Sequence, residues 1–395
     1  MIDIEALDRS DPLAELRQQF LLPEGILYFD GNSLGALHRN VPARMHHLLY
    51  EQWGNHLIQG WLKDGWMDLP SRVGARIAPL IGALPNEVTV ADSTSVNLFK
   101  VLHAALSTTT AGGVILTDTG NFPTDLYIIH SVADTYPDVR VLTVPPADVF
   151  NALDEHPVAV VCLTHVNYRT GAAFDLETLT RRAHERGARV IVDLSHSTGV
   201  FPLALHDWGI DFAVGCGYKF LNGGPGAPAF LYVHERYHSH DLHVAIPGWI
   251  GHHEPFAFSL DYTPAEGVRR FLAGTPYVLS LAALDAALTV YQNLDLHAVY
   301  AKVHRMVTLF AELVKQHCHD AFTCLTPLDY GAHGSQISLA HPQAESIIQQ
   351  LANQGIMADF RPPNVLRFGL SPLYNRYADI AKVVNALGDI LNERS

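Results

Sequence analysis

Short runs rich in Val, Ile and Leu alternate with helical segments between about residues 85 and 235, and this alternation limits the possible folds more than any other feature. The helical segments include 95–106, 122–136 and 176–187. Continuous apolar strands separated by helices are typical of a sheet that helices cover on both faces. We therefore predict an α/β fold with a mixed, mostly parallel seven-stranded sheet, whose strands are 87–92, 113–118, 139–144, 158–164, 188–194, 212–216 and 228–233.

The pattern changes after about residue 276, where mostly helical segments and then a short α+β tail follow. A chain of 395 residues is long enough for two or three structural units. We predict an N-terminal segment (1–60) that joins a small domain, a large ligand-binding domain (61–280) and a small C-terminal α+β domain (281–395).

Composition excludes several classes of protein. The net charge of −14 and the lack of a basic stripe argue against a nucleic-acid partner. The longest apolar run, 278–291, is interrupted by Asp285 and stays below the ~18 residues of a membrane span, so it is predicted to be a core helix. The acidic start lacks the features of a secretory signal, and the four cysteines show no CxxC spacing. We therefore expect a cytoplasmic protein with reduced cysteines.

Lys219 lies in an unusual loop, GCGYKFLNGGPG (215–226), among glycines and aromatic residues. The other five lysines lie in segments that resemble amphipathic helices or polar loops, where we expect the ammonium group to reach water: Lys63, Lys100, Lys302, Lys315 and Lys382. An amine in apolar surroundings is more easily neutral, and a neutral lysine can bind an aldehyde covalently. Lys219 is therefore a candidate covalent anchor.

Polar residues follow several predicted strands, at the edge where open α/β sheets bind ligands. Ser93, Thr94 and Ser95 open a helix, so their hydroxyls and free N–H groups can form a phosphate seat. The alternative is an ordinary helix N-cap. Phe122 follows the second strand with Pro123 at the start of the next helix, although a loop phenylalanine is usually part of the core.

Two further strand ends carry Thr164 and Asp193, and His196 follows three residues later. A carboxylate at Asp193 would be costly without a cationic partner, unless it only caps a turn. A strand-end acid, an isolated lysine, a phosphate seat and a loop aromatic together indicate pyridoxal phosphate. The acid would hold the pyridinium N–H, and the lysine would hold the aldehyde.

Eight short motifs are spread along the chain: GNSLG (31–35), DSTSVNLFK (92–100), NFPTDLY (121–127), LTHVNYRTG (163–171), DLSHS (193–197), GCGYKFLNGGPG (215–226), PGWIGH (247–252) and RFGLSPLYN (367–375). In this order they closely resemble the motifs of the bacterial kynureninase family. The resemblance runs from about residue 12 to the end of the chain. It implies a fold-type-I pyridoxal-phosphate enzyme of the class V aminotransferase group.

Carried over residue by residue, the resemblance implies that Lys219 binds the cofactor covalently and that Asp193 pairs with its ring nitrogen. It further implies stacking by Phe122, support by Asp125 and His196, and phosphate binding by Thr94, Ser95 and Tyr218 with Thr164 nearby. Trp249 and Thr275 would complete the site from the second subunit of an obligate homodimer.

The reaction that the resemblance implies is hydrolysis of L-kynurenine to anthranilate and L-alanine, with Tyr218 as the candidate proton donor. Arg367 would bind the substrate α-carboxylate with help from Asn32 and Ser33. The alternative for Arg367 is an arginine on the surface of a strand. The family often has alanine at Ser195, to which we assign no function.

Substrate preference is predicted from three positions. Family members that favour 3-hydroxykynurenine carry His, Ser and Asn where this sequence has Trp61, Gly274 and Thr275. An indole face offers no acceptor to a ring hydroxyl, so we expect L-kynurenine to be preferred. Trp61 could instead be a core aromatic at a helix end. Whether the enzyme serves tryptophan catabolism or anthranilate supply stays open.

Four other functions compete with this interpretation. A metal hydrolase could use the histidines of HERYHSHDLH, His234, His238, His240 and His243, but no HExxH motif is present. A cysteine desulfurase needs a reactive loop cysteine, whereas Cys162 and Cys216 are predicted inside strands and Cys318 and Cys324 in the small domain. An aminotransferase is not excluded by the cofactor site. A non-catalytic regulator would need a DNA-binding module, which we do not find.

Overall fold

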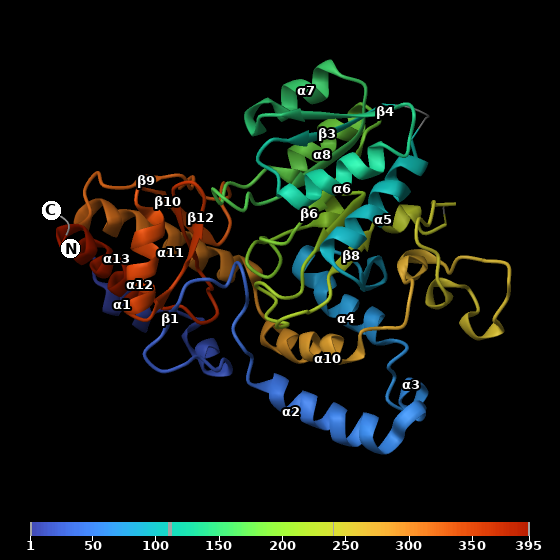
Figure 1. Ribbon diagram of the computed structural model, residues 1–395, viewed down its shortest axis with the longest axis horizontal. Coiled ribbons are helices and arrows are strands. Elements are labelled where there is room, and N and C mark those ends of the chain that lie inside the picture. Colours follow the sequence, from blue (N-terminus) through green and yellow to red (C-terminus); the bar gives the residue numbers. More distant parts are fainter. Residues whose placement is uncertain (1, 110–112, 240, 394–395) are drawn as a thin grey trace.

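The computed structural model describes residues 2–109, 113–239 and 241–393. It has a large lobe built on the central sheet and a small lobe that contains both ends of the described chain (Figure 1). The strand order of the central sheet is β2-β8-β7-β6-β5-β3-β4. These strands are β2 (Val88–Val90), β8 (Phe230–Val233), β7 (Phe212–Gly215), β6 (Arg189–Asp193), β5 (Val158–Thr164), β3 (Gly113–Asp118) and β4 (Val139–Val144).

Every predicted strand is present, and the sheet is mixed as expected. Strand β8 is antiparallel to both of its neighbours, and the other pairs are parallel. Neighbouring strand residues belong to different cores: Val160 packs with one hydrophobic cluster and Val161 with the other. Since successive side chains of a strand point to opposite faces, both faces of the sheet are buried. The predicted fold class is confirmed.

Helices cover the two faces, and their boundaries follow local signals. Helix α5 starts after the N-cap Ser93, and α6 has Pro123 at its first position. Helices α5 and α6 lie on the same side of the sheet (Figure 1). The helices of the large lobe include α4 (Leu69–Ile77), α5 (Thr94–Ser107), α6 (Pro123–Ala133), α7 (Val149–Glu155), α8 (Leu176–Glu185), α9 (Leu205–Trp208) and α10 (Val278–Ala287).

The small lobe is an antiparallel sheet of order β12-β13-β10-β9 packed with helices. Its elements are α11 (Leu296–His317), β9 (Thr323–Cys324), β10 (Gln336–Ala340), α12 (Ala344–Asn353), β11 (Ile356–Met357), β12 (Asp359–Arg361), β13 (Val365–Gly369) and α13 (Tyr377–Asn392). The N-terminal segment reaches this lobe, because β1 (Leu27–Tyr28) pairs with β11 and α1 (Ile4–Arg9) contacts α13. The borders 1–60, 61–280 and 281–395 stay a prediction.

A helical arm, residues 40–63, runs along the outside of α10 (Figure 1). It comprises α2 (Asn40–His47), a continuing helix over Leu48–His56, and α3 (Gly60–Lys63). The apolar segment 278–291 forms α10 and the helical turn after it, and most of its residues are buried, as predicted for a core helix. Of the helices in the described ranges, none combines the length and hydropathy that crossing a bilayer requires.

The expectation that the other lysines reach water is wrong for two of them. Lys100 is 1% exposed and Lys302 is 5% exposed, because α5 is packed on nearly all sides and Lys302 lies on the buried face of α11. Each ammonium group has a carboxylate partner: Lys100 bonds to Asp92, and Lys302 lies 2.7 Å from Asp11. Such pairing is what makes a buried charge tolerable. Lys219 differs, since its partner is a histidine.

Candidate active site

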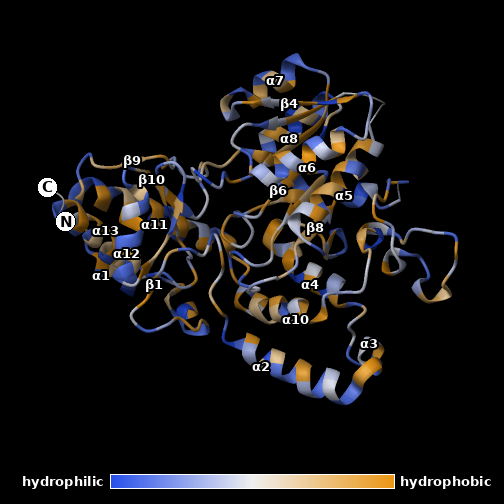
Figure 2. Ribbon diagram, in the orientation of Figure 1, coloured by the Kyte–Doolittle hydropathy of each residue, from blue (hydrophilic) through white to orange (hydrophobic). Residues whose placement is uncertain are grey.

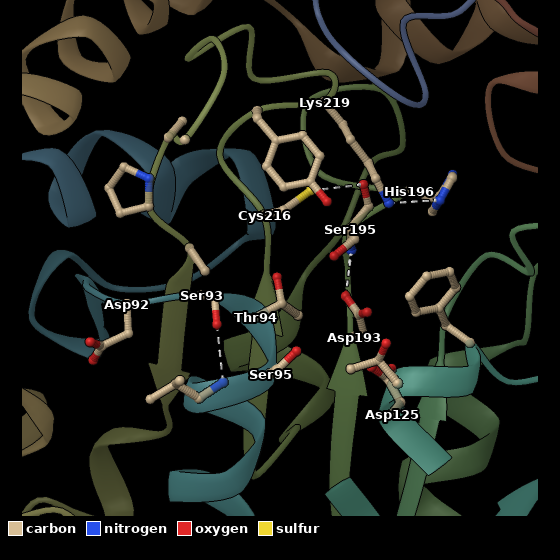
Figure 3. A pocket seen from close by; sticks show the side chains of 18 of the residues that line it. Asp92, Ser93, Thr94, Ser95, Asp125, Asp193, Ser195, His196, Cys216 and Lys219 are labelled. Atoms are coloured by element: carbon tan, nitrogen blue, oxygen red, sulfur yellow. Dashed lines mark hydrogen bonds between the residues drawn. The ribbon is translucent and has the colours of Figure 1, made fainter. Parts of the chain in front are cut away.

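The carboxyl ends of β5, β6 and β7 open into a cavity of about 620 Å³. Lys219 enters it from a loop on the side opposite to Asp193 and Asp125 (Figure 3). Nine of the predicted site residues line this cavity or its rim: Thr94, Ser95, Phe122, Asp125, Thr164, Asp193, His196, Tyr218 and Lys219. The cavity lies at the carboxyl ends of strands, where open α/β sheets bind ligands.

The Lys219 loop is held by the N-terminal segment. The Gly35 N–H donates to the Tyr218 carbonyl oxygen at 2.8 Å. A Cβ atom at Gly35 would overlap the Lys219 carbonyl oxygen and lie 2.5 Å from Asn222 Oδ1. Only glycine allows this close approach. Residues 31–35 thus touch the lysine loop directly, a contact between segments almost 190 positions apart.

Lys219 Nζ lies 3.0 Å from His196 Nε2, at the base of the cavity. Burial lowers the pKa of His196 well below its usual value, and the positive charge of Lys219 lowers it further. The imidazole is therefore neutral near pH 7 and can accept a hydrogen bond from the lysine amine. This contact places His196 beside the candidate anchor.

Asp193 and Asp125 form a pair of buried carboxyl groups at the opposite side of the cavity. They are 6% and 3% exposed, and neither forms an ion pair with a residue in the described ranges. Asp193 Oδ1 accepts a hydrogen bond from the Ser195 N–H at 2.7 Å, so the turn-capping role is also present. Two adjacent buried carboxyls need a positive partner. The protonated ring nitrogen of pyridoxal phosphate fits this requirement.

Burial raises the pKa of Asp125 well above its ordinary value of 3.8, and the charge of Asp193 raises it further. The folded, cofactor-free protein therefore keeps a proton that the unfolded chain releases, and it loses stability as the pH rises from 3.8 to the raised pKa. Asp125→Asn should remove this cost. We expect the variant to be stabilised over wild type more at about pH 8 than at about pH 5 in urea unfolding. An equal difference at the two pH values would contradict the assignment.

The N-terminus of α5 faces the same cavity. Ser93 Oγ accepts the Val96 N–H at 3.4 Å, so the ordinary capping interpretation holds for Ser93. Thr94 and Ser95 carry the next two hydroxyls, and both point toward the cavity (Figure 3). Free N–H groups and two hydroxyls at a helix N-terminus suit a phosphate group.

Three more predicted residues line the cavity. Phe122 is 42% exposed and contacts Tyr168 edge-on, so it is not a core residue. Thr164 Oγ1 donates to Asn121 Oδ1 at 2.5 Å and lies 3.4 Å from Asp125 Oδ2. Burial raises the pKa of Tyr218, and the nearby Cys216 and Asp193 raise it further. The Tyr218 hydroxyl therefore stays protonated near neutral pH.

Arg367 lies beside the cavity rather than on the surface, so the surface alternative is wrong. It is 1% exposed, and its Nη1 donates to the carbonyl oxygen of Tyr168 at 2.7 Å. Its Nη2 donates to Ser33 Oγ at 2.8 Å. Asn32 is fully buried and donates to Gln336 Oε1 at 3.2 Å. The structure thus places the Ser33 hydroxyl against Arg367. The side chain of the preceding residue, Asn32, contacts Gln336 instead.

Besides Arg367, Ser33 and Asn32, four predicted residues do not line this cavity within their own chain. Trp61 lies in α3, where it contacts Trp66 edge-on at 5.4 Å. Trp249 lines a separate surface hollow, and Gly274 and Thr275 line a small neighbouring one. Nothing lies within 4 Å of a Cβ atom built at Gly274. One chain alone therefore does not bring these residues to the lysine.

Sequence reasoning missed some residues that line the cavity. Asp92 adopts a left-handed backbone (φ +52°) just before the phosphate seat, and its carboxylate accepts the Tyr277 hydroxyl at 3.1 Å. Tyr168 and Tyr277 both line the cavity. An aspartate directly before a Ser/Thr-rich helix start was the available signal for Asp92. No local signal places Tyr277, because its contact depends on how residues 272–277 pack.

Cys216 requires a correction, because it was predicted inside a strand. It lies one residue beyond β7, where it lines the cavity and its Sγ is 3.8 Å from the Ser195 carbonyl oxygen. Burial raises the pKa of this thiol, although the charge of Lys219 acts in the opposite direction. A protonated, buried thiol is a poor nucleophile, so its position does not favour the desulfurase alternative.

The metal alternative finds little support in the described residues. His234 does approach Glu87 and His206, whose ligand atoms lie within 4.8 Å of one another. Hydrogen bonds already use these atoms: Glu87 Oε1 accepts the Glu235 N–H and contacts His206 Nδ1, and His234 Nδ1 accepts the Arg236 N–H. His238 bonds to the Val233 carbonyl oxygen, His243 packs on His103, and His240 lies outside the described residues.

A lysine loop facing a strand-end aspartate, with a helix N-terminus beside them on a sheet of this order, defines the class of fold-type-I pyridoxal-phosphate enzymes. Solved structures agree with this fold. A C-DES mutant with glycine covalently linked to its PLP cofactor matches with a TM-score of 0.82 at 20% identity over 94% of this chain and 99% of that one. The cysteine desulfurase CsdA of Escherichia coli matches with a TM-score of 0.81 at 21% identity over 96% and 98%.

Sequence relatives identify the family within this class. The kynureninase of Deinococcus radiodurans is 47% identical over 100% of this chain and 97% of its own length. The kynureninase of Pseudomonas fluorescens is 44% identical over 100% and 96%. The kynureninase C-terminal domain family matches residues 299–387. The chain belongs to the kynureninase family, and the resemblance seen in its motifs is confirmed.

Proposed function

We propose that this enzyme hydrolyses L-kynurenine to anthranilate and L-alanine with pyridoxal phosphate as its cofactor. The observation that carries the proposal is the position of Lys219 opposite the uncompensated Asp193–Asp125 pair, in a chain of the kynureninase family. The direct test is incubation of the purified protein with L-kynurenine while anthranilate fluorescence and alanine are followed. No anthranilate from cofactor-loaded protein would refute the proposal.

The cofactor would be held by groups that lie around the cavity. Lys219 would anchor its aldehyde, Asp193 would pair with its ring nitrogen, and Thr94, Ser95 and Tyr218 would bind its phosphate with Thr164 nearby. Phe122 would stack on the ring, and Asp125 and His196 would support the cofactor. When bound, pyridoxal phosphate supplies an electron sink that makes cleavage of the carbon–carbon bond feasible.

The protein residues then bind the substrate and move protons. Arg367 holds the α-carboxylate, with Ser33 and Asn32 behind it. Lys219 Nζ takes the proton from the substrate Cα, and neutral His196 keeps the amine oriented through its Nε2. The Tyr218 hydroxyl, which stays protonated, gives a proton to the carbon that becomes the methyl group of alanine. The aromatic side chains that line the cavity limit the access of water, which protects the reaction from side reactions.

The working unit is a homodimer that shares its active sites. The helical arm (40–63) carries several hydrophobic residues (Figure 2). Large apolar side chains among them are exposed in the single chain, which suits a buried interface. They are Leu49, Tyr50, Trp53, Leu57, Ile58 and Leu62. Trp249 and Thr275, which lie outside their own chain's cavity, would reach the cofactor phosphate of the other subunit. The free cysteines suit a reducing cytoplasm.

Sharing of sites predicts complementation between two inactive variants. Mixing Lys219→Ala with Thr275→Ala subunits places both mutations in one site of the mixed dimer and leaves the other site intact. We expect recovery of up to about one quarter of wild-type activity, since random exchange makes half of the dimers mixed. The measurement is anthranilate release after subunit exchange, which a label on one variant verifies. Exchange without recovery would contradict shared sites.

L-Kynurenine should be preferred over its 3-hydroxy form. Trp61, Gly274 and Thr275 would form the aryl pocket, contributed across the dimer, and they offer a ring hydroxyl few partners. An apolar pocket rejects an added hydroxyl by at most about a hundredfold, so the ratio of kcat/KM values should lie between one and roughly that limit. Competition between the two substrates measures it.

Gly274→Ser offers a matched test, because the structure has room for its side chain. This variant should shift the preference toward the hydroxylated substrate. An inverted preference in the wild type, or no shift in the variant, would mean that these residues do not form the aryl pocket.

A further inference from the structure

Arg367 and Asp359 face each other across the small sheet. They are direct partners in the antiparallel register of β12 and β13. Arg367 Nε donates to Asp359 Oδ1 at 2.8 Å, and Arg367 Nη2 donates to Asp359 Oδ2. This is a bidentate contact along one edge of the guanidinium plane. Arg367 is 1% exposed, so the pair is almost shielded from water.

The second edge of the guanidinium carries different partners. Nη1 donates to the carbonyl oxygen of Tyr168, and Nη2 also donates to Ser33 Oγ. Tyr168 lines the cavity that contains Lys219, so a partner of this second edge belongs to the wall of the cavity. A guanidinium has five N–H groups, so it can bind Asp359 along one edge and a second carboxylate along the other.

The Asp359 carboxylate has hydrogen-bond partners other than Arg367. Arg361 Nη2 donates to Asp359 Oδ2 at 2.7 Å, and the Ser33 hydroxyl donates to the same oxygen at 2.9 Å. Arg361 therefore neutralises part of the negative charge of Asp359. Part of the positive charge of Arg367 thus stays available to an incoming anion. Ser33 joins the two sides, because its oxygen also accepts from Arg367.

We propose that Asp359 is a positioning residue for the substrate α-carboxylate: it holds one edge of Arg367 so that the other edge faces the cavity. The inference rests on the proposed role of Arg367. The substrate carboxylate displaces the neutral oxygen of Ser33 and leaves the Asp359 contact intact. In the opposite interpretation, Asp359 mimics the substrate carboxylate and competes with it. The two interpretations predict effects of opposite sign.

Asp359→Asn separates these interpretations in the cofactor-loaded enzyme. The amide keeps the size of the side chain but sets an NH₂ group against an Arg367 donor. We expect KM for L-kynurenine and Kd for L-alanine, followed by the cofactor absorbance, to rise roughly tenfold to a hundredfold, while kcat falls much less. A competing Asp359 would instead give lower KM and Kd values. Unchanged or lower values would overturn the inference.

A ligand without the carboxylate tests the specificity of the effect. Inhibition by decarboxylated kynurenine should be the same in wild type and Asp359→Asn, because Arg367 has nothing to bind in it. Weaker inhibition in the variant would indicate general damage to the site and contradict the proposal. Asp389→Asn, the same change on the exposed face of α13, is the matched control and should leave all constants unchanged.

Two further variants make the outcome decisive. Asp359→Glu keeps the charge and displaces it by one methylene, so its KM should lie between those of wild type and Asp359→Asn. It also replaces the asparagine variant if that protein does not fold. Arg367→Ala, measured in parallel, distinguishes a failure of the proposed role of Arg367 from a failure of the proposed role of Asp359. If Arg367→Ala leaves KM unchanged, the proposed role of Arg367 fails; if only the Asp359 variants are silent, this inference fails.

Discussion

Lys219→Ala should reduce kcat by roughly 10⁴-fold, the upper range for loss of a positioned acid–base group. The variant loses both the covalent anchor and the amine that moves the Cα proton. Its fold should persist, because the Lys219 loop is held by backbone contacts with Gly35 and Asn222, which do not involve the lysine side chain. Anthranilate release gives the rate, and thermal unfolding verifies the fold.

Borohydride reduction followed by peptide mapping tests the same residue in the wild type. The pyridoxyl group should be found on Lys219. The buried Lys100 is the stringent internal comparison, since it is shielded from water but already bonds to Asp92 and to the Phe271 carbonyl oxygen. Lys315→Ala, on the exposed side of α11, should keep full activity. A label on any other lysine would refute the assignment.

Arg367→Ala should lower kcat/KM, and the loss should correspond to about 3 kcal/mol or more of transition-state binding. This is the scale for losing one partner of a buried charge pair. The cofactor absorbance should persist, because Arg367 touches the cavity only through its edge near Tyr168. The remaining carboxylate of Asp359 still has Arg361 as a partner, which limits the structural damage.

Arg367→Lys refines this experiment. It keeps a positive charge but loses the planar fork, so it cannot hold Asp359 and the substrate carboxylate at once. We expect it to recover only a small part of the loss. Arg181→Ala, on the exposed face of α8, is the control and should be silent. Near-normal activity of Arg367→Ala would show that another group binds the carboxylate.

Local patterns predicted the large lobe well. Strands β3, β4 and β5 have the predicted bounds, because each is rich in Val, Ile or Leu and lies between clear turn or helix signals. The positions of Lys219 and Asp193 also follow locally: one interrupts a glycine-rich loop, and the other ends a buried strand. The fold and the cofactor could therefore be predicted from residues that are close together in the sequence, and so could Lys219 as the candidate anchor.

The tertiary structure decided the contacts between distant segments. The burial of Lys100 could not be predicted, since the helix pattern does not show that α5 is covered on nearly all sides. The pairing of Asp125 with Asp193 depends on the adjacent ends of β5 and β6 and on the start of α6.

The surroundings of Arg367 were likewise decided by the tertiary structure. The sequence determined by itself that a lysine, a strand-end aspartate and a helix N-terminus would meet at one edge of an α/β sheet, because parallel strands bring their carboxyl ends together. Only the packing of the small sheet against residues 31–35 decided that Arg367 would be held by Asp359 and Ser33. Such contacts arise from the register of strands and from the approach of segments hundreds of residues apart, for which the sequence carries no local signal.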